Sequence, residues 1–407
     1  RLPFHIDSTP GEQYPMSLIR LPLWSSPFRP FFLLGALYGA LLMLLWIPQY
    51  TGLLPPREDP LGGLPLLWHQ HEILFGFSAA IVIGFILTAL PSWAGTTEIK
   101  GSKLALLLLS WILGRLAVTF SAELPLPLVA VVDLSFPLLF ALSVRPRPGE
   151  TRLQISLGLA VISALLLVGN LSYYLGALQH DLQLTQQGLR IGLYAIIFHC
   201  SVTVGILAPI FTENALFEDG QPVDIGHIPW LEWLSALSIL VLAAVDIAGV
   251  SPSVGGTLAL LCCLLHGVRM GRWHSLKIRS MPIVWVLHCG YGWLVISLLL
   301  LALETYGLSI GAESWVHAFT VGGFGLMSLG LMTRVTLRHT GRELQPHPIV
   351  VGAFLCLASA AVVRVAIPIA SLGHEWLLLS ALLWVIPYII YLLFYSQLLL
   401  TPSLPTE

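Results

Sequence analysis

Charged residues are scarce in this chain. Only 10% of its 407 residues are Asp, Glu, Lys or Arg, whereas soluble domains carry about a quarter. Hydrophobic residues make up 56% of the sequence. This composition excludes a soluble protein built around one large core and indicates a polytopic membrane protein.

Several motifs and residue types that define other protein classes are also missing. The sequence has no P-loop, no glycine-rich dinucleotide fingerprint and no zinc-finger spacing. Its net charge is −2 and its basic residues are scattered in short groups, so no nucleic acid partner is expected. The first apolar run lacks a small-residue cleavage site, so no removable signal peptide is expected. The five cysteines form no CxxC pair and are expected to be buried free thiols: Cys200, Cys262, Cys263, Cys289 and Cys356.

Long apolar runs fill the chain instead. A helix needs about 20 apolar residues to cross a bilayer. Windows of this kind are found near 29–48, 68–90, 104–121, 125–144, 153–176, 190–211, 230–248, 253–270, 282–303, 315–337, 348–370 and 376–400. The fold class expected is therefore an all-α integral membrane protein with a bundle of twelve transmembrane helices. Its expected parts are a cytoplasmic or interfacial segment (1–28), one transmembrane domain (29–400) and a short tail (401–407).

The charges in the loops predict the orientation. Lys and Arg are concentrated on the side of the two termini, for example at Lys100, Arg145 and Arg342, whereas the other side has only Arg57 and Arg190. Positive loops stay in the cytoplasm. Both termini are therefore expected to be cytoplasmic.

Histidine is the main polar signal within the apolar runs. Ionisable residues inside membrane spans are rare and usually functional. Seven histidines lie in or beside the predicted spans: His69, His71, His199, His266, His288, His317 and His339. Their expected depths allow two metal-binding clusters, one of His69, His71, His199 and His317, the other of His266, His288 and His339.

The stretch WHQHE concentrates three of these polar residues (Trp68 to Glu72). On a regular α-helix, His69 and His71 point about 200° apart, so they should not bind one metal together. His69 and Glu72 are three residues apart and share a face, so they are expected to form the coupled pair. Glu72 could orient the imidazole of His69 or relay protons, or these groups could simply face water at a helix start. His71 would then face His199 or His317.

Other polar residues in the spans have narrower expected roles. Arg115 and Arg364 lie deep enough to need an anion, and the candidate partners are Asp133 and a haem propionate. Arg334 could pair with a propionate or with a lipid phosphate. Inter-helix polar contacts are expected from Asn170 and Asp246. The glycines of the tenth span, which favour close helix packing but could also admit a flat macrocycle, are Gly322, Gly323, Gly325 and Gly330.

Four stretches together resemble the NnrS family. They are FRPFF (Phe28–Phe32), WHQHEILFGF with the following GFILTALPSWAG, LHCGYGWLVI (Leu287–Ile296), and HAFTVGGFGLMSLGLMTRVTLRHTGR (His317–Arg342). The resemblance covers nearly the whole chain. Arg338 stands where the family pattern has glycine, and SWAG replaces NWTG. The matching positions are His69, His71, Glu72, His199, His266, His288, His317, Arg334 and His339.

The resemblance implies a bacterial inner-membrane protein of nitric-oxide metabolism that contains haem b, with copper as an additional metal left open. The expected reaction is the reduction of NO to N2O, supplied by an electron donor that the sequence does not identify. Glu72 and His69 are the expected catalytic pair, and the expected cofactor-binding residues are His71, His199, His317, His288 and Arg334. Two alternatives are a non-enzymatic haem or copper protein that protects against nitrosative stress, and a transporter of a metal or nitrosyl complex.

Overall fold

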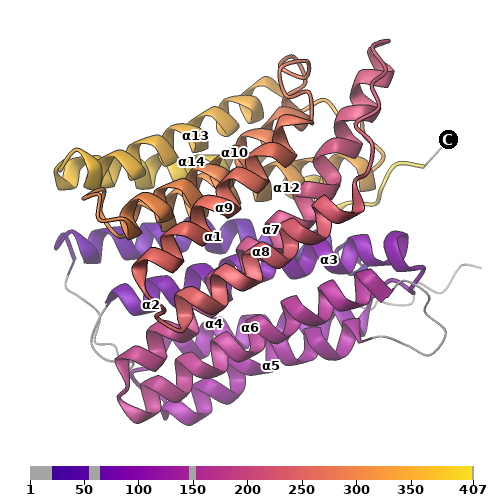
Figure 1. Cartoon of the computed structure of the whole chain (residues 1–407). Coiled ribbons are helices and arrows are strands. Elements are labelled where there is room, and N and C mark those ends of the chain that lie inside the picture. Colours follow the sequence, from indigo (N-terminus) through magenta and orange to yellow (C-terminus); the bar gives the residue numbers. More distant parts are fainter. Residues whose placement is uncertain (1–20, 55–64, 146–152, 406–407) are drawn as a thin grey trace, which may run out of the picture.

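The computed structural model describes residues 21–54, 65–145 and 153–405, and residues 1–20 of the predicted N-terminal segment lie outside these ranges. Within them the chain is helical and forms no strand. Twelve of the described helices are long and apolar enough to cross a membrane (Figure 1). The predicted all-α bundle of twelve spans is therefore confirmed by length and composition, and the chain is a multi-pass membrane protein.

The spans follow one another with short connections. In chain order they are α1 (Phe28–Tyr50), α2–η3–α3 (Pro65–His71, Glu72–Ser78 and Ala79–Ala94), α4 (Ser102–Thr119), α5 (Leu126–Val144), α6 (Leu153–Gln179), α7 (Leu182–Glu218), α8 (Pro229–Ile247), α9 (Pro252–Gly271), α10 (Pro282–Thr305), α11–η4–α12 (Ser314–His317, Ala318–Phe324 and Gly325–His339), α13 (Pro348–Ile369) and α14 (His374–Leu400). Most ends lie close to the predicted windows.

The sixth span departs most from its predicted window. The apolar run covers 190–211, but α7 extends over 37 residues, Leu182–Glu218. Asp181 caps its first turn, because its side chain accepts a hydrogen bond from the backbone N–H of Leu184 at 3.0 Å. A hydropathy window detects only the part of a helix that suits lipid. The polar turns at both ends of α7 were therefore missed.

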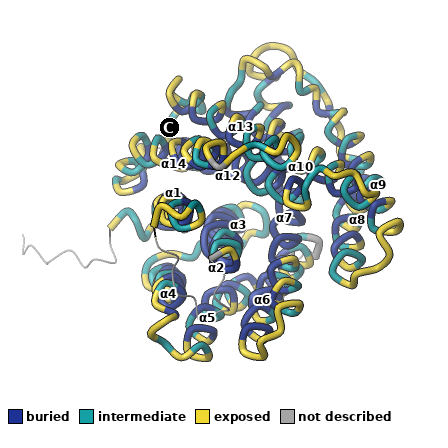
Figure 2. Tube along the Cα trace, turned by 90° about the vertical axis from the view of Figure 1, so that its left-hand side faces the viewer, coloured by how far each residue is buried: buried dark blue, intermediate teal, exposed yellow. Residues whose placement is uncertain are grey.

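Three spans form the centre of the bundle. The second, sixth and tenth spans have 89%, 78% and 78% of their most apolar window buried, compared with 28% to 61% for the other nine. The end-on view shows α3, α7 and α12 inside a ring of the remaining helices (Figure 2). Contacts of α5 with α6, of α9 with α10 and of α14 with α1 join neighbouring helices of this ring. The arrangement thus recurs every four spans, although the sequence shows no obvious repeat.

The two described ends of the chain lie at the same end of the bundle. Arg29, at the start of α1, donates hydrogen bonds through Nη1 to the backbone oxygens of Leu399 (2.9 Å) and Thr401 (2.7 Å). Figure 1 shows this end on the right, where the C-terminal tail leaves the bundle. An even number of crossings requires this arrangement. The cytoplasmic orientation of this end stays a prediction.

Two of the central spans contain a π-helical turn. The turn η3 begins at Glu72, directly after His71, and η4 begins at Ala318, directly after His317. Such turns are rare and often occur at functional sites. The glycines of η4 serve close packing, as predicted: a Cβ at Gly322 would lie 2.5 Å from the Trp293 ring. Both π-helical turns therefore mark places where the helix register departs from regular α geometry beside a histidine.

Candidate functional site

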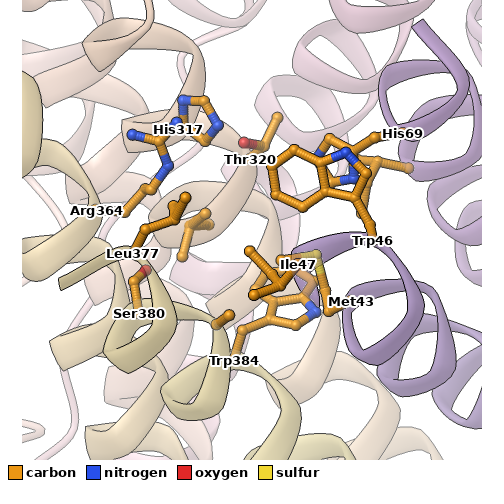
Figure 3. Close-up of a pocket in the computed structure, with 13 residues that line it drawn as sticks. Met43, Trp46, Ile47, His69, His317, Thr320, Arg364, Leu377, Ser380 and Trp384 are labelled. Atoms are coloured by element: carbon orange, nitrogen blue, oxygen red, sulfur yellow. The ribbon is translucent and has the colours of Figure 1, made fainter. Parts of the chain in front are cut away.

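Two of the predicted histidines line one small pocket, here called the two-histidine pocket. It is formed by α1, the second span, the tenth span, α13 and α14, and Figure 3 shows His69 and His317 on opposite sides of it. The pocket residues are Met43, Trp46, Ile47, His69, Ile73, His317, Thr320, Val321, Arg364, Leu377, Ser380, Ala381 and Trp384. His69 comes from the second span and His317 from the tenth, which are both central. The fold thus joins two residues that are 248 positions apart.

The side of the pocket that carries His69 is held by aromatic stacking. The imidazole of His69 stacks on the indole of Trp46, with ring centroids 3.9 Å apart and planes 19° from parallel. This stack fixes the ring without using its nitrogen atoms. Nδ1 of His69 is buried and has no hydrogen-bond partner in the described part of the chain. The nitrogen therefore remains open to a bound group.

Two indole groups of the same pocket are also unpaired. Nε1 of Trp46 and Nε1 of Trp384 are buried without a partner among the residues that the structure describes. An indole N–H can only donate, so each of these groups lacks an acceptor. Leaving a buried polar group unpaired costs about 1–3 kcal/mol. The two indole N–H groups and Nδ1 of His69 are thus three polar groups of one pocket that a bound acceptor or donor could satisfy.

The opposite side of the pocket is organised by Glu313. Nδ1 of His317 donates to the backbone oxygen of Glu313 at 2.8 Å, because a carbonyl can only accept. In the neutral ring, Nε2 then keeps its lone pair. Metal-binding histidines are usually oriented in this way. The carboxylate of Glu313 accepts a hydrogen bond from Nη2 of Arg364 at 3.0 Å, which supplies the anion that the sequence predicted for this arginine.

The pocket is small and its remaining walls are largely apolar. Its volume is about 60 Å³. This is space for a few water-sized groups and well below the 300–1,000 Å³ typical of cofactor pockets. Met43, Ile47, Ile73, Val321 and Leu377 supply the apolar surface. A diatomic ligand fits without movement, whereas a macrocycle fits only when the lining side chains move apart.

His71 and Glu72 belong to a different site. Nδ1 of His71 lies 2.8 Å from Oε1 of Glu72, and Nε2 lies 2.9 Å from Oδ1 of Asn170. The predicted pairing of His69 with Glu72 is therefore wrong, and His71 does not face His199 or His317. The physical reason is the π-helical turn that begins at Glu72, because the three-residue spacing of a regular helix does not apply there.

A buried ionic network surrounds Glu72. Nη1 of Arg115 donates to Oε1 of Glu72 at 2.5 Å, and Nη2 donates to Oδ1 of Asp133. The hydroxyl of Tyr38 donates to Oε2 of Glu72. Asp133 also accepts hydrogen bonds from Asn170 (2.8 Å) and Tyr174 (3.0 Å). Asp133 is thus confirmed as a partner of Arg115. The network ties the second span to α1, α4, α5 and α6.

His199 lies in a second pocket, here called the His199 pocket. It is about 20 Å³ in volume, and its lining residues are Phe32, Ile81, Val82, Phe85, His199, Cys200, Val204, Phe324, Met327, Ser328, Leu331 and Met332. Nδ1 of His199 lies 3.3 Å from the hydroxyl of Thr203, one turn along α7. This places His199 apart from the two-histidine pocket. The first predicted cluster is therefore divided among three places.

Arg334 lines a cavity larger than both of these pockets, here called the Arg334 cavity. Its volume is about 400 Å³, and Arg338, His339, Phe211 and Glu218 also line it. The guanidinium of Arg334 lies over the ring of Phe211, 3.7 Å from its centroid. Arg334 follows His317 by 17 residues along one span, which is about 25 Å of helix. One haem cannot contact both residues.

The second predicted cluster does not form. His288 has both ring nitrogens occupied by hydroxyl groups, Nε2 by Thr212 at 2.9 Å and Nδ1 by Ser275 at 2.8 Å. Nδ1 of His266 lies 2.7 Å from the hydroxyl of Tyr291. His339 packs against Phe28 instead, with ring centroids 5.5 Å apart. Depth along the helix placed these histidines at similar levels but did not predict their positions around the bundle.

No cluster of three metal ligands is present among the described residues, counting His, Cys, Asp and Glu. The five cysteines are free as predicted, although only Cys200, Cys262 and Cys263 are buried. The donor types of the two-histidine pocket suit haem, although its volume of about 60 Å³ is too small for the macrocycle unless the lining moves apart. The pocket offers two imidazoles for an iron, and a guanidinium with two indole N–H groups for carboxylates. No corresponding thiolate and imidazole set for copper is found in the described ranges.

The class of protein that these features define is a helical membrane protein of twelve spans. Unpaired histidine and tryptophan nitrogens lie between its second, tenth and outer spans. The profile of the NnrS protein family matches residues 22–403. The chain therefore belongs to the NnrS family, as the sequence motifs predicted. Membership links it to a function related to nitric oxide. No curated protein matches the chain.

Four residues in or beside these sites were not predicted. The sequence did not single out Trp46 and Trp384 as site residues, because tryptophan is common near the ends of membrane spans. Glu313 could have been found, since it precedes His317 by four residues and therefore lies one helical turn away. Nothing in the sequence predicted that Tyr38 would contact Glu72.

Proposed function

We propose that this chain is a haem-containing protein of the bacterial inner membrane that binds nitric oxide and reduces it to N2O. Membership of the NnrS family supports the link to nitric oxide. The observation that carries the proposal is the two-histidine pocket, where His69, Trp46 and Trp384 each present a buried nitrogen without a partner. A site of this chemistry suits a haem with a small acceptor ligand.

The two histidines would have different roles at the haem. His317 would hold the haem iron through Nε2, because its Nδ1–H bond to Glu313 leaves the lone pair on Nε2 and makes the ring a better ligand. His69 is the proposed distal group, since stacking on Trp46 holds its ring while Nδ1 stays unpaired. Arg364 and the indole N–H groups of Trp46 and Trp384 would bind the propionates. The side chains that line the pocket have to move apart to admit the macrocycle.

The reaction consumes two NO, two electrons and two protons and releases N2O and water. Haem iron would supply the position at which NO binds and receives electrons. The apolar walls of the pocket, such as Ile73 and Val321, keep water away from the bound gas. His69 would donate a hydrogen bond to the oxygen of bound NO. NO is uncharged and reaches this pocket through the lipid or through the protein.

The proposal is tested on the purified protein in detergent or nanodiscs. A Soret band that shifts on addition of NO is expected, and N2O should appear when an artificial electron donor is supplied. His69→Ala should retain haem and lose most of the N2O formation, whereas the surface variant His227→Ala should behave as wild type. A folded protein without a Soret band would refute the proposal.

The same measurements separate the alternatives. A haem protein that binds NO but releases no N2O with any donor would be a protective carrier. A folded chain that lacks haem and moves a metal complex across vesicles would be a transporter. The Arg334 cavity is larger than the two-histidine pocket, about 400 Å³ against about 60 Å³. Haem lost on changing His339, and kept on changing His317, would place the cofactor in the Arg334 cavity instead.

A further inference from the structure

Three cavities lie in series along the tenth span. His317, Thr320 and Val321 line the two-histidine pocket. Phe324, Met327, Ser328, Leu331 and Met332 line the His199 pocket. Leu331, Arg334, Val335, Arg338 and His339 line the Arg334 cavity. The order of these residues along one helix places the His199 pocket between the other two, near the middle of the membrane span.

The His199 pocket adjoins both neighbours through shared side chains. Phe85 and Leu331 line both this pocket and the Arg334 cavity, so the two cavities adjoin at these side chains. On the other side, Phe77 lies edge-on to Phe324, with ring centroids 5.8 Å apart, and edge-on to Trp384, also at 5.8 Å. Phe324 lines the His199 pocket and Trp384 lines the two-histidine pocket. The ring of Phe77 therefore connects one lining residue of each pocket.

The chemistry of the His199 pocket selects for a small uncharged ligand. Its volume of about 20 Å³ is near that of a single water-sized group. Most of its lining is apolar and it is enclosed by the central spans α3, α7 and α12 together with α1. No Asp, Glu, Lys or Arg lines it. Apolar cavities stay dry and, when they are large enough, bind apolar gases such as xenon.

We propose that the His199 pocket binds nitric oxide as a transient gas site on a route from the Arg334 cavity to the two-histidine pocket. Phe77 and Phe324 form the internal gate of this route, and their rings turn aside to let a diatomic molecule pass. His199 supplies the imidazole of the lining. Its ring lies edge-on to that of Phe85, with the two centroids 6.2 Å apart. The assignment of NO rests on the proposed function, whereas the gas site itself does not.

The gas site is tested first without haem chemistry. Xenon-129 NMR of the protein in nanodiscs should show a bound-xenon signal. Val204 lines the pocket and is buried, whereas Val202 lies on the same helix, outside the lining and partly exposed. Val204→Phe should abolish the xenon signal by filling the pocket, Val204→Ala should strengthen it, and Val202→Phe should leave it unchanged. The absence of bound xenon in wild type and in Val204→Ala would overturn the site.

The route is tested on the haem-loaded protein with carbon monoxide as the diatomic probe. After flash photolysis, CO rebinding should slow by about tenfold in Val204→Phe, since the filled pocket adds a barrier, and remain unchanged in Val202→Phe. If Val204→Phe does not fold, Val204→Ala still tests the route, because the smaller side chain should speed CO rebinding. Equal rates in all variants would overturn the route. A missing Soret band with bound xenon present would instead refute the proposed function and leave the gas site intact.

Discussion

Nδ1 of His71 lies 2.8 Å from Oε1 of Glu72, although the two residues are neighbours in sequence. Neighbouring side chains on a regular α-helix diverge by about 100°. Here the helix changes to a π-helical turn at Glu72. Arg115 and Tyr38 hold the same carboxylate. The contact therefore belongs to a network that locks the second span in an unusual register and leaves His69 free for the pocket on the other face.

Removing the cation of this network should destabilise the protein strongly. In Arg115→Met, Glu72 and Asp133 would remain buried without their shared guanidinium. Breaking a buried ion pair costs about 3–5 kcal/mol. We expect a large decrease in the melting temperature of the purified protein, measured by the fluorescence of a thiol-reactive dye.

The matched control for this prediction is the pair of Arg190 and Asp246. Their side chains are 49% and 19% exposed and their atoms lie 2.8 Å apart. An exposed pair contributes about 0–1 kcal/mol. Arg190→Met should therefore change the melting temperature little. Equal losses in the two variants would show that the network around Glu72 has no special structural role.

Two features of the protein, its twelve spans and the need of Arg115 for an anion, could be predicted from the sequence. The twelve spans were predicted because the length of an apolar run must match the bilayer. Asp133 was one of two candidate partners for a buried arginine, the other being a haem propionate, because a buried charge needs a counter-ion; the structure pairs it with Arg115. Both rest on requirements that hold whatever the arrangement of the helices.

The contacts of the histidines could not be predicted in the same way. Pairing His69 with Glu72 assumed regular α geometry, and no hydropathy pattern reveals a π-helical turn. Grouping His266, His288 and His339 used depth alone, which does not say where a helix stands around the bundle. The pocket of His69 and His317 depends on that lateral order, which the contacts between α1, α13, α14 and the central spans establish.

A second buried cation requires a glycine beside it. Arg269 donates to the backbone oxygen of Ser201 at 2.7 Å and to the hydroxyl of Tyr291 at 3.0 Å, and it pairs with Glu232. A Cβ at Gly205 would lie 2.0 Å from Nη1 of this arginine. Gly205→Ala should therefore cost about 1–3 kcal/mol through overpacking, measured as a lower melting temperature.

Gly352→Ala provides the control for the glycine prediction. A Cβ at Gly352 would meet nothing within 4 Å. Alanine is also the better helix former by about 1 kcal/mol. We expect this variant to melt at or slightly above the wild-type temperature. A Gly205→Ala protein as stable as Gly352→Ala would contradict the close approach of Arg269.

The orientation of the bundle can be tested with reporter fusions. The basic loops and both chain ends are expected on the cytoplasmic side. Green fluorescent protein fused after Glu407 should fluoresce, and alkaline phosphatase fused after His180, between α6 and α7, should be active. Alkaline phosphatase fused after Gly220, between α7 and α8, should be inactive. The reverse pattern would place the two-histidine pocket on the cytoplasmic side.

Opposite effects on haem retention are expected when Arg364 and Arg334 are substituted. Arg364 lines the two-histidine pocket and Arg334 lines the larger cavity at the other end of the tenth span. Arg364→Gln should lower the haem content of the purified protein by removing the cation for a propionate. Arg334→Gln should retain haem. If Arg334→Gln alone loses haem, the cofactor lies in the larger cavity.

The most direct test of the proposed site is the haem content of His317→Ala, measured by the pyridine haemochrome assay beside His69→Ala, His199→Ala and His339→Ala. The proposed roles predict that His317→Ala folds and loses its haem, and that adding imidazole restores the Soret band. The other three variants should keep haem, with an altered spectrum of the NO complex in His69→Ala alone. Full haem content in folded His317→Ala would contradict the assignment of His317 as the axial ligand.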